Sequence, residues 1–144
     1  MPLVIDANVV FSCVISRDRA LDTVFGLYDK GVALISPEYL LEEIERNRRK
    51  IVKCSGLSSE EVTFFVSNLF SEFISPVPES KYACFLEEAK TISPDLKDAP
   101  YFAVSLAYDK SPIWSREPRL AKQKHVKVLS DEKVRAYFGI KEEL

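Results

Sequence analysis

Histidine and cysteine are scarce in this chain of 144 residues. It contains one histidine, His125, and three cysteines, Cys13, Cys54 and Cys84, which are widely spaced and form no Cys-x-x-Cys pair. This shortage argues against a Cys/His zinc site, a Ser-His-Asp triad and a catalytic Cys-His pair. The odd number of cysteines predicts reduced, mostly buried thiols rather than a disulfide framework.

Long apolar runs are also missing. No stretch approaches the ~20 apolar residues that a membrane-spanning helix needs, and the first residues lack the pattern of a secretory signal. The net charge of −2, from 20 basic and 22 acidic residues, gives no global signal for a polyanionic partner. Length and composition are those of one globular domain. We therefore expect a single cytoplasmic domain over residues 1–144, without a membrane segment.

Short apolar runs alternate with segments of helical periodicity along the whole chain. Such a pattern predicts a parallel sheet with helices on both faces, an α/β fold of three α/β/α layers. The expected strands are residues 2–5, 32–35, 73–77, 113–114 and 126–129.

Two helix starts have recognisable local signals. Ser58 and Glu61 have the spacing of a capping box, and Ser36 followed by Pro37 predicts an N-cap with a proline at the first helical position. The helix after Pro37 is expected to turn an apolar stripe inward, Leu41 included, and to carry basic residues on its other side.

Three acids occupy positions that a parallel sheet brings to one edge. Asp6 directly follows the first strand, Glu117 lies just past the fourth, and Asp98 precedes an alanine-rich helix. Ligands of open α/β sheets bind outside the carboxyl ends of the strands. We therefore expect these acids to meet there, joined by a glutamate of the helix after the second strand, with Asp95 as a fifth candidate.

Such a cluster of acids is expected to bind a cation, because neighbouring carboxylates otherwise repel one another. Mg²⁺ and Mn²⁺ prefer oxygen ligands and promote phosphodiester hydrolysis without histidine or cysteine. Each acid also has a structural alternative: Asp6 as a turn residue, Asp98 as an N-cap and Glu117 as a solvated loop acid. Their joint placement favours the metal site for Asp6 and Asp98, and less strongly for Glu117.

Four segments of the chain follow one another in a recognisable order: Val4-Ile5-Asp6-Ala7-Asn8-Val9, Glu43-Ile44, Asp95-x-x-Asp98-Ala99-Pro100-Tyr101 and Pro112-Ile113-Trp114-Ser115. Together they resemble the PIN domain family of the small single-domain prokaryotic or archaeal kind, and the resemblance covers essentially the whole chain. It implies the sheet order 3-2-1-4-5, cleavage of single-stranded RNA with Mg²⁺ or Mn²⁺, and frequent homodimers. Many such proteins are toxins that pair with an antitoxin protein.

The resemblance also implies the roles of individual residues. Asp6, Glu43 and Asp98 match the first three catalytic, metal-binding acids, while Asn8 and Ser115 match supporting polar positions, as a residue that orients the first acid or a metal-bound water and as a hydroxyl after the fourth strand. Glu43 is preferred to its neighbour Glu42 because Ile44 follows it as in the family. Helical geometry alone leaves both glutamates open.

The loop after the fourth strand departs from the family pattern. Where the family usually has Ser-Asn-Asp or Thr-x-Asp, this chain has Ser115-Arg116-Glu117. Glutamate keeps the charge of the fourth metal ligand but adds a methylene, and Arg116 is expected to neutralise it. The alternative to a ribonuclease is thus a weakened PIN-like module that binds RNA or a protein partner without turnover.

Basic residues gather in two segments near these acids. Arg46, Arg49 and Lys53 follow Glu43 along the chain, and Arg116 and Arg119 follow the fourth strand. If both groups flank the acids, they hold the RNA backbone electrostatically. The alternative for either group is a solvated helix face.

Overall fold

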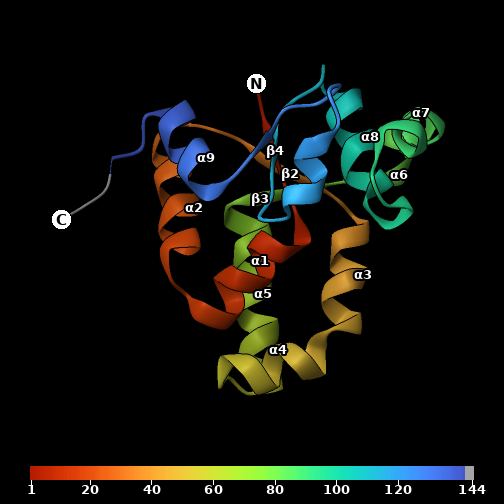
Figure 1. Ribbon diagram of the computed structural model, residues 1–144. Coiled ribbons are helices and arrows are strands. Elements are labelled where there is room, and N and C mark those ends of the chain that lie inside the picture. Colours follow the sequence, from red (N-terminus) through yellow and green to blue (C-terminus); the bar gives the residue numbers. More distant parts are fainter. Residues whose placement is uncertain (142–144) are drawn as a thin grey trace.

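A computed structural model describes residues 1–141 of the chain, and strands and helices alternate along it (Figure 1). The strands are β1 (Leu3–Ile5), β2 (Leu34–Pro37), β3 (Ile74–Val77), β4 (Ile113–Trp114) and β5 (Val128–Leu129). The α-helices are α1 (Ala7–Ser16), α2 (Arg19–Asp29), α3 (Tyr39–Arg46), α4 (Arg48–Ser55), α5 (Ser59–Glu72), α6 (Glu79–Tyr82), α7 (Leu86–Ile92), α8 (Ala99–Ala107) and α9 (Asp131–Phe138). Three 3₁₀ helices complete this part of the chain: η1 (Ala83–Phe85), η2 (Leu96–Asp98) and η3 (Pro118–Lys122).

The strands form one parallel sheet in the order β3-β2-β1-β4-β5, which confirms the expected fold. Val4 in the central strand β1 pairs with Ile35 of β2 on one side and Ile113 of β4 on the other. The order of the strands changes direction at β1 and β4. The carboxyl ends of these two strands therefore lie side by side, at the place where open α/β sheets bind ligands.

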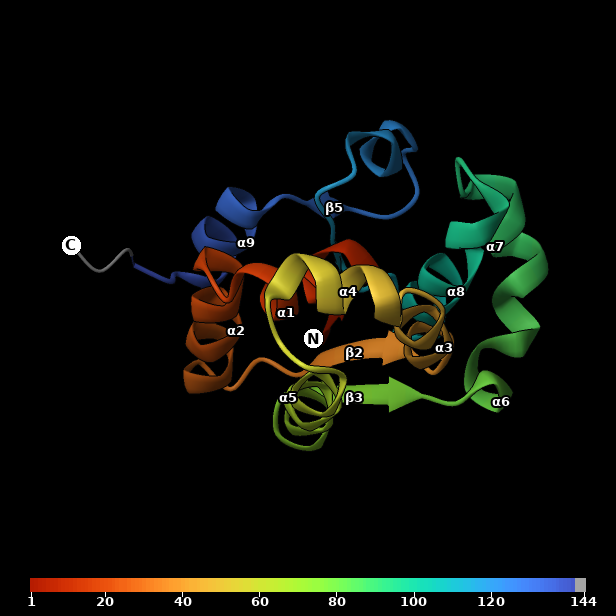
Figure 2. The ribbon, with the colours of Figure 1, turned by 90° about the horizontal axis from the view of Figure 1, so that it is seen from below.

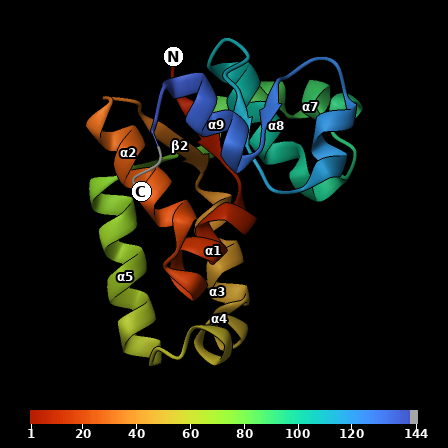
Figure 3. The same cartoon turned by 60° about the vertical axis from the view of Figure 1, so that its left-hand side comes forward.

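Helices cover both faces of the sheet. α8 packs against β1, β2 and β4, with α6 and α7 outside it, while α2 and α9 lie on the opposite side (Figure 1). α3, α4 and part of α5 project beyond the sheet as a helical extension that α1 also contacts (Figure 3). The two covering layers confirm the predicted α/β/α arrangement.

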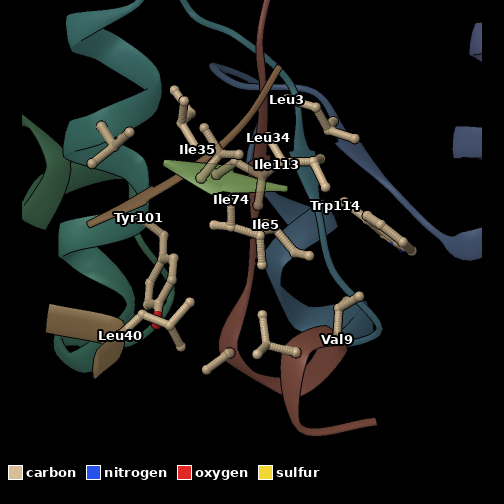
Figure 4. Close-up of a cluster of buried hydrophobic side chains, with 14 of the residues drawn as sticks. Leu3, Ile5, Val9, Leu34, Ile35, Leu40, Ile74, Tyr101, Ile113 and Trp114 are labelled. Atoms are coloured by element: carbon tan, nitrogen blue, oxygen red, sulfur yellow. The ribbon is translucent and has the colours of Figure 1, made fainter. Parts of the chain in front are cut away.

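The core lies between β1, β4 and the helices on either side. Ile5, Ile113 and Trp114 are fully buried in the strands, and Tyr101 of α8 and Val9 of α1 extend this cluster (Figure 4). Because β1 and β4 are buried on both faces, their side chains are apolar without alternation. The first polar residue after β1 therefore comes at the edge of a rigid core.

The predicted helix start at Ser36 and Pro37 is wrong. Both residues belong to β2, where they pair with Pro76 and Val77 of β3, and α3 begins only at Tyr39. Pairing with a neighbouring strand thus overrides the local capping signal.

The expected burial of Leu41 is also wrong, since 37% of its surface is exposed. α3 buries Leu40 and Ile44, which lie one turn apart on the same face, and Leu41 falls outside that narrow stripe. The same helix ends at Asn47, where α4 begins in a new direction (Figure 3).

Other local predictions have mixed outcomes. The capping box is confirmed: Glu61 N–H donates to Ser58 Oγ at 3.1 Å, and Ser58 N–H donates to Glu61 Oε1 at 2.9 Å. The cysteines are free thiols, but only Cys13 is buried, because Cys54 and Cys84 lie on exposed helical faces. Within residues 1–141, no helix has the length and apolarity to cross a membrane.

Candidate active site

Asp6 lies where β1 ends and α1 begins. The residue is only 5% exposed. Its Oδ1 accepts a hydrogen bond from the Ala7 N–H at 2.9 Å, and its Oδ2 accepts one from Ser115 Oγ at 2.7 Å. Ser115 follows β4, so the two neighbouring strands hold this carboxylate in one orientation.

Glu43 reaches the same region from α3. Its Oε1 accepts a hydrogen bond from the hydroxyl of Tyr101, a buried residue of α8, at 2.5 Å. Glu42, by contrast, is exposed. The structure therefore gives a geometrical reason to prefer Glu43 over Glu42.

Asp98 stands at the N-terminal end of α8 and is half-buried. Burial, followed by the nearby charges of Asp6 and Asp95, raises its pKa from the ordinary 3.8 to about 6. Burial also raises the pKa of Asp6, and the charges of Glu43 and Glu117 add to this increase. The four acids thus influence one another electrostatically, although they come from distant parts of the sequence.

The pKa of Glu43 is raised as well. Burial is the main cause and the charge of Asp98 contributes, while the Tyr101 hydrogen bond and the Arg46 charge act in the opposite direction. Proximity of like charges is costly for an empty site, because each carboxylate disfavours ionisation of the others.

Glu117 is held differently from the other acids. Its Oε1 lies 3.2 Å from Arg119 Nε and also accepts the Arg119 N–H at 3.4 Å. The prediction that Arg116 neutralises Glu117 is wrong, because Arg116 turns toward α9 and pairs with Asp131 at 2.7 Å. It also donates to Ser12 Oγ at 2.5 Å. Arg116 is thus engaged in linking the β4 loop to α1 and α9.

The two remaining supporting candidates have distinct places. Asp95 caps η2 by accepting the Lys97 N–H at 3.1 Å, and its charge acts on Asp98. Asn8 is exposed on the first turn of α1. The hydrogen bonds that orient Asp6 come from Ser115 and from the backbone of Ala7, and the side chain of Asn8 is not among their donors.

The basic candidates separate into two groups. Arg46 lies 5.2 Å from the ring centre of Tyr39, and its positive charge lowers the pKa of Glu43. The charge of Arg119 lowers the pKa of Asp98 in the same way. Arg49 and Lys53 are exposed on α4, beyond the break at Asn47. Arg46 and Arg119 are therefore the candidates whose charges affect the acids, and Lys97, which the sequence analysis did not single out, affects Glu43 and Asp98 as well.

Comparison with known proteins agrees with this geometry. The PIN domain family model matches residues 4–138. The chain belongs to the PIN domain family. PIN domains are in general nucleases, act on nucleic acids and use divalent metals such as Mg²⁺. No curated protein and no solved structure gives a significant match to the chain.

The acids of this PIN domain suit a divalent ion by their chemistry. Carboxylate oxygens are the ligands that Mg²⁺ and Mn²⁺ prefer. Burial, and after it the charge of a neighbouring acid, raises the pKa of Asp6, Glu43 and Asp98, and a cation would favour the charged form of each. Among residues 1–141, no three acidic, histidine or cysteine side chains are close enough to share an ion as they lie. A shared ion would therefore require at least some of these side chains to move closer to Asp6.

Tyr101 is a site residue of this PIN domain to which the sequence analysis assigned no role. It lies three residues after Asp98, so both side chains share one face of the chain segment that enters α8. That spacing is the only signal in the sequence. The hydroxyl contact with Glu43, 58 residues away, joins α8 to α3 through the tertiary fold and cannot be read from local pattern.

Proposed function

We propose that this PIN domain is a Mg²⁺- or Mn²⁺-dependent endoribonuclease that cleaves single-stranded RNA in the cytoplasm. The observation that carries the proposal is the electrostatic coupling of Asp6, Glu43, Asp98 and Glu117 at the carboxyl ends of β1 and β4. Each acid comes from a different segment of the chain. Structural roles for the single residues do not explain why four carboxylates gather there.

The acidic residues of the site are the proposed ligands of the ion. Asp6, Glu43 and Asp98 bind the ion, and Glu117 joins them after it leaves Arg119. When bound, the ion activates water and stabilises charge on the phosphate.

Hydrogen bonds and nearby cations support that arrangement. Ser115 and Tyr101 keep Asp6 and Glu43 oriented, as residues that hydrogen-bond to metal ligands generally do. Arg46 and Arg119 supply positive charge beside the acids, which favours a phosphodiester backbone.

Cleavage of an unstructured fluorescent RNA tests this proposal. We expect cleavage in Mn²⁺ and none in EDTA, and we expect Asp6→Asn and Asp98→Asn to reduce the rate to background with the fold intact by circular dichroism. Asp109→Asn is the matched control, because Asp109 is exposed in a turn with positive φ that asparagine tolerates. Equal cleavage in EDTA and Mn²⁺ contradicts the proposal.

A second candidate is a PIN-like module that binds RNA or a protein partner without turnover. The ion pair between Arg119 and Glu117 favours it, because it occupies the fourth acid. This candidate predicts RNA binding with no Mn²⁺-dependent cleavage, and none gained when Arg119→Gln frees the carboxylate. Appearance of cleavage in either protein rules it out.

We also propose a homodimer. Large apolar side chains remain exposed on α2 and α5: Phe25 is 42%, Tyr28 57% and Phe64 72% exposed. Phe25 contacts Phe73 in a tilted arrangement with ring centres 5.2 Å apart, and Tyr28 contacts Phe73 edge-on at 5.1 Å, so these three rings form one aromatic cluster. A stable interface buries at least ~1,000 Å² in total. Light scattering at tens of micromolar should give the dimer mass, and a monomer mass contradicts this.

The family resemblance further favours a toxin that pairs with an antitoxin protein. If the protein is such a toxin, its expression should arrest growth, and co-expression of the product of an adjacent gene should relieve the arrest. Unimpaired growth during expression of an active enzyme contradicts the toxin role while leaving the ribonuclease proposal standing.

A further inference from the structure

A pocket of about 400 Å³ opens between α1 and the junction of α3 with α4. Its volume falls within the ~300–1,000 Å³ of typical ligand sites. We name it the α1/α4 pocket. It is lined by Asn8, Phe11, Ser12, Ile15, Ser16, Asn47, Lys50 and Ile51.

The α1/α4 pocket begins beside the candidate metal ligands. Asn8 is two residues beyond Asp6 on α1, and Asn47 is one helical turn beyond Glu43. At a rise of ~1.5 Å per residue, Asn47 lies roughly 6 Å along the helix from Glu43. α1 contacts both α3 and α4, and α4 lies over α1 in the view from below (Figure 2).

The lining combines an aromatic surface with hydrogen-bonding groups. Phe11 is half-buried and supplies a ring, and Ile51 supplies an apolar floor. Asn47 Nδ2 donates to the Glu43 carbonyl at 2.8 Å, which leaves its Oδ1 as an acceptor. Asn8 is exposed and retains an amide with both donors and an acceptor. A flat heterocycle with polar edges matches this combination.

Charge at the mouth also favours a nucleotide. Lys50 is exposed at the pocket wall, and Arg46 lies on the preceding helix near Glu43. Proteins recognise single-stranded RNA by stacking bases on aromatic rings, bonding their edges and attracting the backbone with basic side chains. The α1/α4 pocket offers one group for each of these contacts.

We propose that the α1/α4 pocket binds the base of a nucleotide adjacent to the cleaved phosphodiester and thereby sets the sequence preference of the enzyme. The inference rests on the proposed ribonuclease function. Phe11 stacks on the base, Asn8 and Asn47 contact its edge, and Lys50 pairs with the neighbouring phosphate.

Binding of single nucleotides tests the pocket without requiring cleavage. In metal-free ¹⁵N-labelled protein, we expect at least one of the four ribonucleoside 5′-monophosphates to shift the side-chain amides of Asn8 and Asn47 saturably. Phe11→Leu should weaken that binding at least about fivefold, the low end of a base-aromatic stack. Phe85→Leu is the control, since Phe85 is similarly half-buried and packed on the core elsewhere. No saturable shift, or shifts confined to other residues, overturns the proposal.

An exposed residue provides a second variant that leaves the core untouched. Lys50→Gln should weaken binding of all nucleotides by a similar factor, whereas Lys133→Gln on α9 should leave binding unchanged. If both lysine variants bind equally well, Lys50 has no phosphate role and the proposed binding mode is wrong.

Cleavage of four RNAs that differ at one base next to the scissile bond completes the test. Asn47→Ser should flatten the ratio of kcat/KM values among them. If nucleotides bind in the pocket but RNA is never cleaved, the ribonuclease proposal fails and the pocket stands. If RNA is cleaved without base preference and the nucleotides leave Asn8 and Asn47 unshifted, the pocket fails and the ribonuclease stands.

Discussion

Asp6 and Glu117 lie on neighbouring loops at the same edge of the sheet, yet they are held in opposite ways. Asp6 is buried and accepts hydrogen bonds from the Ala7 backbone and from Ser115. Glu117 has 32% of its side chain exposed and pairs with Arg119, which is itself 55% exposed. The first carboxylate is fixed by the core, and the second is held by a surface contact.

This difference predicts which ligands are prepared for a metal ion. A hydrogen bond to a charged group contributes about 1.5–3 kcal/mol, whereas an exposed ion pair contributes about 0–1 kcal/mol. Asp6 therefore keeps its orientation whether or not an ion is bound, while Glu117 is released from Arg119 at small cost. Four changes test this contrast, from the largest expected effect to the smallest.

Ser115→Ala should have the largest effect because it removes the hydroxyl that fixes Asp6. A buried acceptor left without its donor lowers the free energy of unfolding by about 1–3 kcal/mol, and loss of orientation lowers metal affinity by about 10–100-fold. Urea denaturation and calorimetry with Mn²⁺ measure the two effects.

A buried serine elsewhere provides the control for this change. Ser111 is fully buried and donates to the Tyr108 carbonyl at 2.6 Å. Ser111→Ala should therefore reduce stability to a similar degree but leave Mn²⁺ affinity unchanged. Equal Mn²⁺ affinity in the Ser115 and Ser111 variants would show that Ser115 does not prepare the site.

Tyr101→Phe should come next, since it deletes one hydrogen bond to Glu43 and keeps the buried ring. We expect metal affinity to fall about tenfold, at the lower end for a residue that supports a metal ligand. Tyr82→Phe removes a hydroxyl from another buried tyrosine and should leave affinity unchanged. Calorimetry that finds wild-type affinity in Tyr101→Phe refutes this role.

Arg119→Gln should have a smaller effect in the opposite direction. Freeing Glu117 removes a pairing worth about 0.2–1 kcal/mol, so Mn²⁺ affinity should rise by up to about fivefold. Lys122→Gln removes a neighbouring charge from η3 without breaking this pair. If both variants gain the same affinity, the gain comes from general charge and not from release of Glu117.

The smallest effect concerns pH and Asp98, because solvent around this partly exposed carboxyl screens much of its interaction with the other charges. Its pKa is raised to about 6 in the fold from 3.8, so the metal-free fold gains stability from this group below about pH 4 and loses it as pH rises through 6. The Asp98→Asn variant does not lose this stability, because asparagine does not ionise as the pH rises. Its stability relative to wild type should therefore increase between pH 4 and pH 7, as measured by urea denaturation. A difference that stays constant with pH contradicts the assignment.

Much of the fold was predictable because its signals are local or periodic. Apolar runs gave the strands, and the capping box at Ser58 and Glu61 gave the start of α5. The start of α3 was not predictable in this way, since Ser36 and Pro37 are recruited into β2 by their pairing with β3. Sheet pairing is a long-range interaction that no local cap reveals.

In the candidate site too, local sequence signals predicted some features, and contacts between distant segments determined the others. The ends of β1 and β4 in the sequence were enough to expect Asp6 and Glu117 at one edge of the sheet, and the family resemblance indicated Ser115 and Glu43. The partners of flexible side chains were not predictable. Arg116 pairs with Asp131 of α9 and not with its sequence neighbour Glu117, because the loop directs its side chain toward α9. The hydrogen bond between Tyr101 and Glu43 joins residues 58 apart in the sequence, and no local pattern reveals it.

A crystal structure with Mn²⁺ bound, located by its anomalous scattering, tests the central claim most directly. The account predicts one ion in contact with oxygens of Asp6, Glu43 and Asp98 at roughly 2.0–2.6 Å, with Glu117 turned away from Arg119 toward it. An ion bound elsewhere, or these carboxylates unmoved and without metal at saturating Mn²⁺, would contradict it.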